Sequence, residues 1–129
     1  MNNERYARGS QRLADVDGEA GQHVVDALKD VAPDLARYVI EFGFGDVHSR
    51  PGLDLRTREL ATVAGLAALG HAQAQLKVHV NGALNVGCTP AEVIEVIIQM
   101  ALYAGFPAAL NAAFTAKQVF AERGVSPLS

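Results

Sequence analysis

Sulfur chemistry is nearly absent from this sequence. Its 129 residues contain one cysteine, Cys88, and two methionines. A single thiol excludes an intrachain disulfide, a Cys-x-x-Cys redox pair and a cysteine-rich zinc site. Because disulfides are typical of oxidising compartments, their exclusion favours a protein of the reducing cytoplasm.

Basic residues are also too few to form a charged stripe. The chain has 11 lysines and arginines against 14 aspartates and glutamates, a formal net charge of -3 at pH 7. Nucleic acid and anionic membrane surfaces are therefore poor partners. The first six residues carry charges and lack the apolar core of a secretory signal, so we expect no export.

One uncharged run, residues 96–116, is long enough to cross a bilayer. It contains Gln99, Asn111 and Thr115, and Gly105-Phe106-Pro107 interrupts it. We therefore expect two buried helices that meet at a turn, and no membrane span.

Apolar residues are abundant and make up 50% of the chain, enough for one core of ordinary size. Alanine, leucine and valine dominate, and they do not alternate with polar residues as they would in exposed strands. The sequence therefore predicts an all-α protein. We expect a single-domain bundle of about six to seven helices over residues 1–129.

Proline, glycine and capping residues predict where these helices begin and end. Thr89-Pro90-Ala91-Glu92 is a capping box with proline at the first helical position. Gly70 and Gly87 are typical left-handed helix stops. A loop is expected over residues 45–53, around the Arg50-Pro51-Gly52 turn. The expected helices cover about residues 3–15, 20–31, 33–44, 54–69, 72–86 and 90–104, and a last helix begins at Pro107.

Two of the expected helices, over residues 60–69 and 93–102, are apolar on nearly every face. Such helices must be surrounded by protein, and one small domain rarely encloses two of them. We therefore expect a second copy of the chain to cover part of this surface. In the last helix, the residues expected to point inward are Leu110, Ala113, Phe114 and Phe120.

Glu59 and His79 are the strongest candidates for chemistry. The short turn at Gly70-His71 predicts an antiparallel hairpin of the two flanking helices. Glu59 lies about eleven residues before this turn and His79 about eight after it, an axial offset of about 4.5 Å between helices about 8–10 Å apart. A carboxylate and an imidazole can bridge that gap. Gln75 shares the helical face of His79, and Arg58 neighbours Glu59.

A plainer interpretation of these residues stays open. His79 can be a core histidine bonded to a backbone carbonyl, with Arg58 and Glu59 at a solvated helix start. A metal site has little support, because the four histidines show no His-x-x-x-His or Glu-x-x-His spacing. Serine hydrolase chemistry has even less support, because the sequence contains no Gly-x-Ser-x-Gly motif.

Five segments together match one known family. They are GDVHSRPGL at 45–53, TREL at 57–60, LKVH at 76–79, ALNVG at 83–87 and QMALYAGFPAA at 99–109. In these segments the chain, from about Tyr6 to Gly124, resembles the carboxymuconolactone decarboxylase family, a branch of the alkylhydroperoxidase-like fold. The resemblance implies a ring-shaped homo-oligomer, a trimer or hexamer, with sites near subunit contacts.

The resemblance also implies a type of reaction. The redox branch of this fold carries a Cys-x-x-Cys ahead of the matching histidine, where this chain has Ala72-Gln73-Ala74-Gln75. Thiol relay is therefore excluded. The decarboxylase branch remains. It removes carbon dioxide from a carboxylated unsaturated lactone in the degradation of aromatic compounds, and it needs no cofactor because the lactone accepts the electrons.

For such a carboxy-lyase, each candidate residue has an expected role. His79 is the expected proton donor or oxyanion partner, and Glu59 orients its ring. Arg50 or Arg58 holds substrate carboxylates, and Gln75 donates to a substrate oxygen. The expected partners are a small organic acid or lactone and further copies of the chain.

The sequence departs from the pathway decarboxylases of this family at three positions. Those enzymes commonly carry tryptophan, serine and arginine where this chain has His48, Glu59 and Asn81. The substrate is therefore left open. Two alternatives stand beside the lyase: another small-molecule activity, such as isomerisation or a peroxide-related step without thiol relay, and a non-catalytic helical oligomer.

Overall fold

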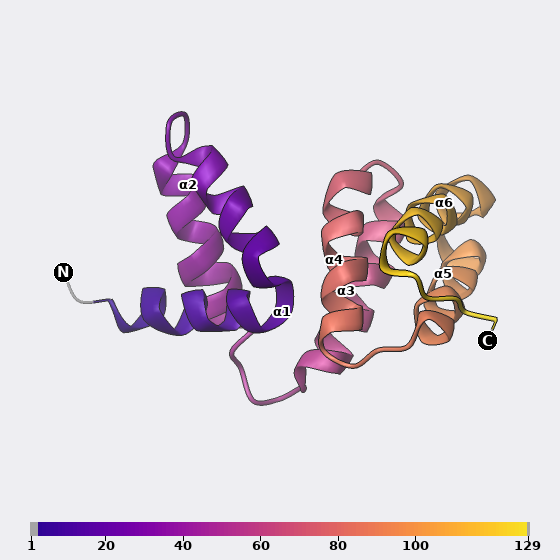
Figure 1. Cartoon of the computed structure of the whole chain (residues 1–129), viewed down its shortest axis with the longest axis horizontal. Coiled ribbons are helices and arrows are strands. Elements are labelled where there is room, and N and C mark those ends of the chain that lie inside the picture. The colour runs from indigo at the N-terminus through magenta and orange to yellow at the C-terminus, as the bar shows by residue number, and fades with distance from the viewer. Residues whose placement is uncertain (1–2, 129) are drawn as a thin grey trace. The chain divides into compact units, whose positions relative to one another are not determined.

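The computed structural model describes residues 3–128 and is all-helical over that range, without a strand. The chain forms two compact units, residues 1–55 and 56–129, and each is described by itself. The expectation of a single domain over residues 1–129 stays a prediction. The helices are α1 (Glu4–Leu28), α2 (Pro33–Tyr38), η1 (Val39–Val47), α3 (Leu55–Leu69), α4 (Gln73–Asn85), α5 (Pro90–Ala104) and α6 (Phe106–Arg123) (Figure 1).

Helix α1 begins close to the residue expected from the sequence and contains the expected break. The Asn3 side chain accepts a hydrogen bond from the Tyr6 backbone N–H. Gly18, at φ 58° and ψ -140°, interrupts the helical backbone and separates the two helices that the sequence predicts. The second part ends at Leu28 rather than near residue 31.

The next segment differs from the prediction of one helix over 33–44. The six α-helical residues of α2 are followed directly by η1, a π-helix of nine residues that ends at Val47. The expected loop over 45–53 therefore begins only at His48. The beginning of η1 lies against α1, where a Cβ on Gly9 would sit 1.9 Å from the Ile40 carbonyl oxygen. Only glycine permits so close an approach of two backbones.

The C-terminal unit has its core where α3, α4, α5 and α6 meet. Buried residues from each helix form one cluster, which includes Val63, Val80, Ile97 and Val119. The capping box is confirmed, because the Thr89 side chain accepts from the Glu92 N–H while the Glu92 carboxylate accepts from the Thr89 N–H. Gly70 and Gly87 end their helices at φ 78° and 102°, as the sequence predicts.

The prediction for the inward face of α6 was wrong at two residues. Phe120 is buried, but Leu110 and Phe114 keep 52% and 65% of their surface exposed. The face of α6 that enters the core instead carries small side chains, among them Ala112 and Ala116, both fully buried. Small residues let α6 approach its neighbours closely, and the larger residues are left on the outer face.

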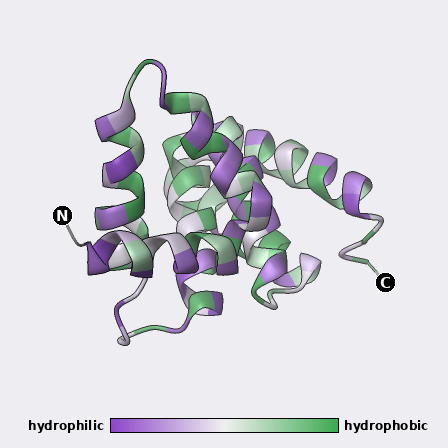
Figure 2. Ribbon diagram, turned by 60° about the vertical axis from the view of Figure 1, so that its left-hand side comes forward, coloured by the Kyte–Doolittle hydropathy of each residue, from purple (hydrophilic) through white to green (hydrophobic). Residues whose placement is uncertain are grey.

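None of the described helices combines the length and apolar character needed to cross a membrane. The ribbon in Figure 2 shows hydrophobic and hydrophilic residues on the same helices. Large apolar side chains nevertheless remain exposed on α5 and α6. The most exposed are Leu102, Tyr103, Phe106 and Phe114.

Candidate functional site

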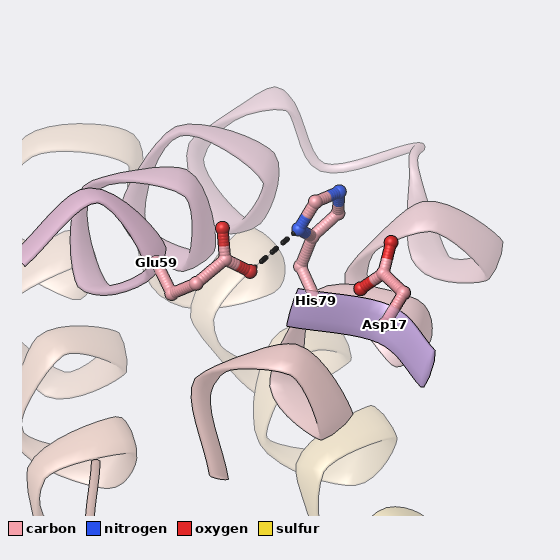
Figure 3. A group of neighbouring side chains, drawn as sticks. All are labelled: Asp17, Glu59 and His79. Carbon is pink, nitrogen blue, oxygen red and sulfur yellow. Dashed lines mark hydrogen bonds and ion pairs between the residues drawn. The ribbon is translucent and has the colours of Figure 1, made fainter. Parts of the chain in front are cut away.

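The hairpin of α3 and α4 brings Glu59 and His79 together. Glu59 lies in the second turn of α3, and His79 lies in the middle of α4. Gly70, with its positive φ, lets the chain reverse between the two helices. His79 Nδ1 lies 2.8 Å from Glu59 Oε1 (Figure 3). The contact predicted from helix geometry is confirmed.

This pair is largely removed from water. Glu59 has no exposed surface, and the His79 side chain is 18% exposed. The solvated helix start that the plainer interpretation requires is therefore wrong for Glu59. A buried carboxylate needs a hydrogen-bonding partner, and the imidazole of His79 is one.

The pairing orients the imidazole. An ionised carboxylate only accepts hydrogen bonds. Nδ1 of His79 therefore carries the proton in its hydrogen bond with an ionised Glu59. Nε2 then becomes the ring nitrogen whose protonation changes. An imidazole held by a carboxylate in this way can accept or deliver a proton at one defined atom.

Core packing holds the two helices at this spacing. Val63 lies one turn beyond Glu59 on α3 and is fully buried. Leu76 and Val80 on α4, on either side of His79 in the sequence, are buried in the same cluster. The polar pair thus lies on a rigid apolar framework, which fixes the distance between its atoms.

The other predicted site residues are more dispersed. Arg58 is partly buried on α3 next to Glu59, and Gln75 is exposed on α4 one turn before His79. Arg50 is exposed and belongs to the N-terminal unit. The structure therefore brings two of the five predicted residues, Glu59 and His79, into direct contact, and the predicted roles of all five stay predictions.

Two polar residues of α1 were missed by the sequence analysis. Asp17 is a buried carboxylate. Arg12 lines a cavity with residues of the loop that follows η1. Neither residue belongs to a motif, and α1 lies outside the segments that carry the family resemblance. The one signal that could have identified them is that each is a charged residue at a position of an amphipathic helix that is expected to be buried.

Comparison with known sequences gives consistent matches. The profile of the carboxymuconolactone decarboxylase family matches residues 33–118. The 4-carboxymuconolactone decarboxylase of Acinetobacter baylyi is 39% identical over 131 residues, covering 98% of this chain and 96% of the relative.

Two further relatives are more distant. An uncharacterized 15.0 kDa protein of Paracoccus denitrificans is 32% identical over 121 residues, covering 92% of this chain and 90% of the relative. The nitrosuccinic acid decarboxylase of Metarhizium robertsii is 34% identical over 94 residues, covering 70% and 65%. The family match covers most of the chain and reaches into both units, and it confirms the resemblance. This all-helical chain, with its paired Glu59 and His79, belongs to the carboxymuconolactone decarboxylase family.

Proposed function

We propose that this protein is a cofactor-free carboxy-lyase that decarboxylates a carboxylated unsaturated lactone similar to 4-carboxymuconolactone. The observation that carries the proposal is the buried hydrogen bond between Glu59 and His79, which provides an oriented proton donor. The match to a 4-carboxymuconolactone decarboxylase over nearly the whole length supports the choice of substrate class.

The reaction needs no external electron acceptor. When the bond between the ring carbon and its carboxylate breaks, carbon dioxide leaves and the electron pair passes into the conjugated lactone carbonyl. The resulting dienolate carries its charge on oxygen. A protonated His79 then delivers the Nε2 proton to the distal carbon, which moves the double bond and restores the carbonyl. The imidazole regains its proton from solvent.

Glu59 acts in this proposal as a positioning residue. Its carboxylate holds Nδ1 of His79 and stabilises the imidazolium before the proton is transferred. Arg58 or Arg50 pairs with a carboxylate of the substrate, because a guanidinium binds both carboxylate oxygens at once. Gln75 donates to a substrate oxygen. These contacts orient the substrate so that the proton donor lies next to the carbon atom that is protonated when the carboxylate leaves.

A related substrate class is the second candidate. One relative is named for nitrosuccinic acid, in which a nitro group can take up the electron pair as the lactone carbonyl does. Both acids lose carbon dioxide to give a carbanion next to an electron-withdrawing group. The three residues at which this chain departs from the pathway decarboxylases, His48, Glu59 and Asn81, favour a substrate that differs from that of those enzymes.

Direct assay distinguishes these substrates. Purified protein is mixed with 4-carboxymuconolactone or with nitrosuccinate, and absorbance loss and carbon dioxide release are followed together. We expect equal rates of both signals with the lactone, and neither signal with His79→Ala. Release of carbon dioxide from nitrosuccinate alone would replace the lactone by the second candidate. Absence of release from either acid would contradict the lyase and favour an isomerase, a peroxide-related activity or a non-catalytic role.

We also propose that the chain works as a homo-oligomer, a trimer or hexamer, in the cytoplasm. The exposed apolar residues of α5 and α6 support self-association, since monomers seldom leave several large side chains of this kind in water. The absence of paired thiols supports a reducing compartment.

A further inference from the structure

A cavity of about 330 Å³ lies in the N-terminal unit, between α1 and the loop that follows η1. We call it the loop cavity. Its polar lining consists of Arg12, His48, Ser49, Arg50 and Asp54, and proline and leucine side chains complete it. Ligand sites commonly have volumes of about 300–1,000 Å³, so this cavity suits a small molecule.

Arg12 has a donor that the protein does not use. Its Nη1 donates to Asp15 Oδ2 at 3.2 Å, one turn further along α1. Its Nε is buried and has no hydrogen-bond partner among the described residues. A buried donor left unpaired is costly, and a turn of the Arg12 side chain that brings Nε to an acceptor atom of a ligand would remove that cost.

The opposite wall is held in place by η1. The His48 ring packs against the Phe44 ring with centroids 4.8 Å apart, and the His48 backbone N–H donates to the Gly43 carbonyl. Ser49 Oγ donates to the Phe44 carbonyl at 2.6 Å. The first residues of the loop are thus attached to the end of η1. A wall held by these contacts can present its side chains in a defined arrangement.

The charges on the lining favour an anion. Two guanidinium groups, of Arg12 and Arg50, line the cavity together with one carboxylate, of Asp54, while Arg12 also pairs with Asp15, which does not line it. Guanidinium groups bind carboxylates through two parallel hydrogen bonds, a geometry that lysine cannot offer. The Arg12 side chain is 34% exposed, so water and solutes reach part of it.

We propose that the loop cavity binds a carboxylate group of a small organic acid, and that Arg12 is the residue that selects it. The proposal rests on the proposed function for the chemical class of its ligand, an organic acid. It adds a binding site and a residue to which no role has been assigned.

Amide-detected NMR titration of the full chain tests this inference without any turnover. Succinate and inorganic phosphate are titrated separately at constant ionic strength of about 0.1 M, where exposed charges more than about 10 Å apart are largely screened. We expect saturable succinate shifts at the amides of residues 48–54, with weaker binding of phosphate. Tighter binding of phosphate than of succinate would overturn the assignment to an organic acid.

Variants separate a specific site from general charge attraction. Arg12→Gln is expected to raise the succinate dissociation constant at least tenfold. Lys29→Gln removes the same charge from the exposed end of α1, outside the cavity, and is expected to bind like the wild type. Equal loss in both variants, or no loss in either, would overturn the role of Arg12. Arg12→Lys keeps the positive charge but cannot form two parallel hydrogen bonds with a carboxylate. It provides a second test if Arg12→Gln does not fold. Unchanged affinity in that variant would also overturn the role of Arg12.

One further variant keeps this inference distinct from the proposed function. His79→Ala is expected to retain the succinate shifts at residues 48–54, because His79 does not line the loop cavity. Loss of those shifts in His79→Ala would overturn the placement of the site in the N-terminal unit. A protein that binds succinate in this way but decarboxylates neither acid would contradict the proposed function alone.

Discussion

At the scale of single residues, a buried carboxylate hydrogen-bonded to an imidazole is the feature on which the proposed activity depends. Glu59 is fully buried in α3, and its partner His79 keeps a small exposed area. Burying a charged group far from water is costly unless it is paired. The pair therefore makes a stable arrangement only because both residues are present, and 18% of the His79 side chain stays exposed to solvent.

His79→Ala is the most direct test at this scale. General acid or base assistance is typically worth about 10²–10⁴ in rate, so we expect kcat to fall by that factor. His79→Gln should be similarly inactive but more stable, because its amide can still donate to the Glu59 carboxylate. Activity is measured by carbon dioxide release, and stability by thermal melting. Retained turnover with a lowered melting temperature would return His79 to a purely structural role.

At the scale of elements, the contact between α1 and η1 depends on the absence of side chains. Gly9 faces the backbone of η1, where an added Cβ would lie 1.9 Å from the Ile40 carbonyl oxygen. Atoms cannot approach so closely, so a larger residue must push the two helices apart. The π-helical geometry of η1 adds to this dependence, since it sets where the Ile40 carbonyl points.

Gly9→Ala is therefore expected to destabilise the protein strongly. Overpacking of a tight contact costs about 1–3 kcal/mol and sometimes more, and we expect the upper end of that range because backbone atoms must move. Gly43→Ala is the matched control in the same unit, because its added Cβ meets no atom within 4 Å. Urea denaturation measures both. Equal stability of the two variants would show that α1 and η1 are not in close contact in solution.

An exposed ion pair also connects α1 with η1 and should make stability depend on pH. Arg5 donates two hydrogen bonds to Asp46, at 3.0 and 2.8 Å. The hydrogen bond from Arg5 holds the pKa of Asp46 below its ordinary value of 3.8, with the positive charges of Arg5 and Arg8 as further causes. A lowered folded-state pKa stabilises the protein above the ordinary value, and this stabilisation is lost as the pH falls through the lowered value.

In Asp46→Asn, the melting temperature should accordingly fall less steeply as the pH is lowered into the acid range. We expect the variant to be slightly less stable than the wild type at pH 7, because exposed pairs contribute little. The difference should shrink as the pH falls below about 3.8. Melting temperatures of both proteins between pH 2 and pH 7 measure it. A constant difference across that range would mean that the pair does not form in solution.

At the scale of the whole molecule, the outer surface of α5 and α6 requires an explanation. Leu102, Tyr103 and Phe106 each keep more than 70% of their surface exposed, and Phe114 follows with 65%. Apolar side chains collected on two packed helices are typical of a surface that another protein covers. Closed homo-oligomers are the commonest way in which such surfaces are covered.

Light scattering at micromolar concentration should therefore give the mass of a trimer or hexamer. Leu102→Glu places a charge among the exposed apolar residues and should shift the protein towards monomer. Leu128→Glu, which changes an exposed leucine of the C-terminal segment, serves as its control. A monomeric wild-type protein would contradict self-association and, with it, any site shared between subunits.

The sequence by itself determined the helical class and most helix boundaries, and it offered the contact between Glu59 and His79 beside a plainer alternative. Each follows from local rules: a capping box defines the start at Pro90, left-handed glycines define the stops at Gly70 and Gly87, and a short turn pairs the flanking helices in register. Helix geometry then brings residues at similar distances from the turn together.

Only the tertiary structure decided which faces are buried and how the chain continues after α2. Leu110 and Phe114 are apolar but exposed, because α6 packs through its small residues and periodicity does not reveal which of two apolar faces turns inward. The π-helix beyond Tyr38 and the cavity beside Arg12 depend on contacts between segments more than thirty residues apart. Such contacts leave no local signal, because burial is set by what packs against a residue and not by its neighbours in the chain.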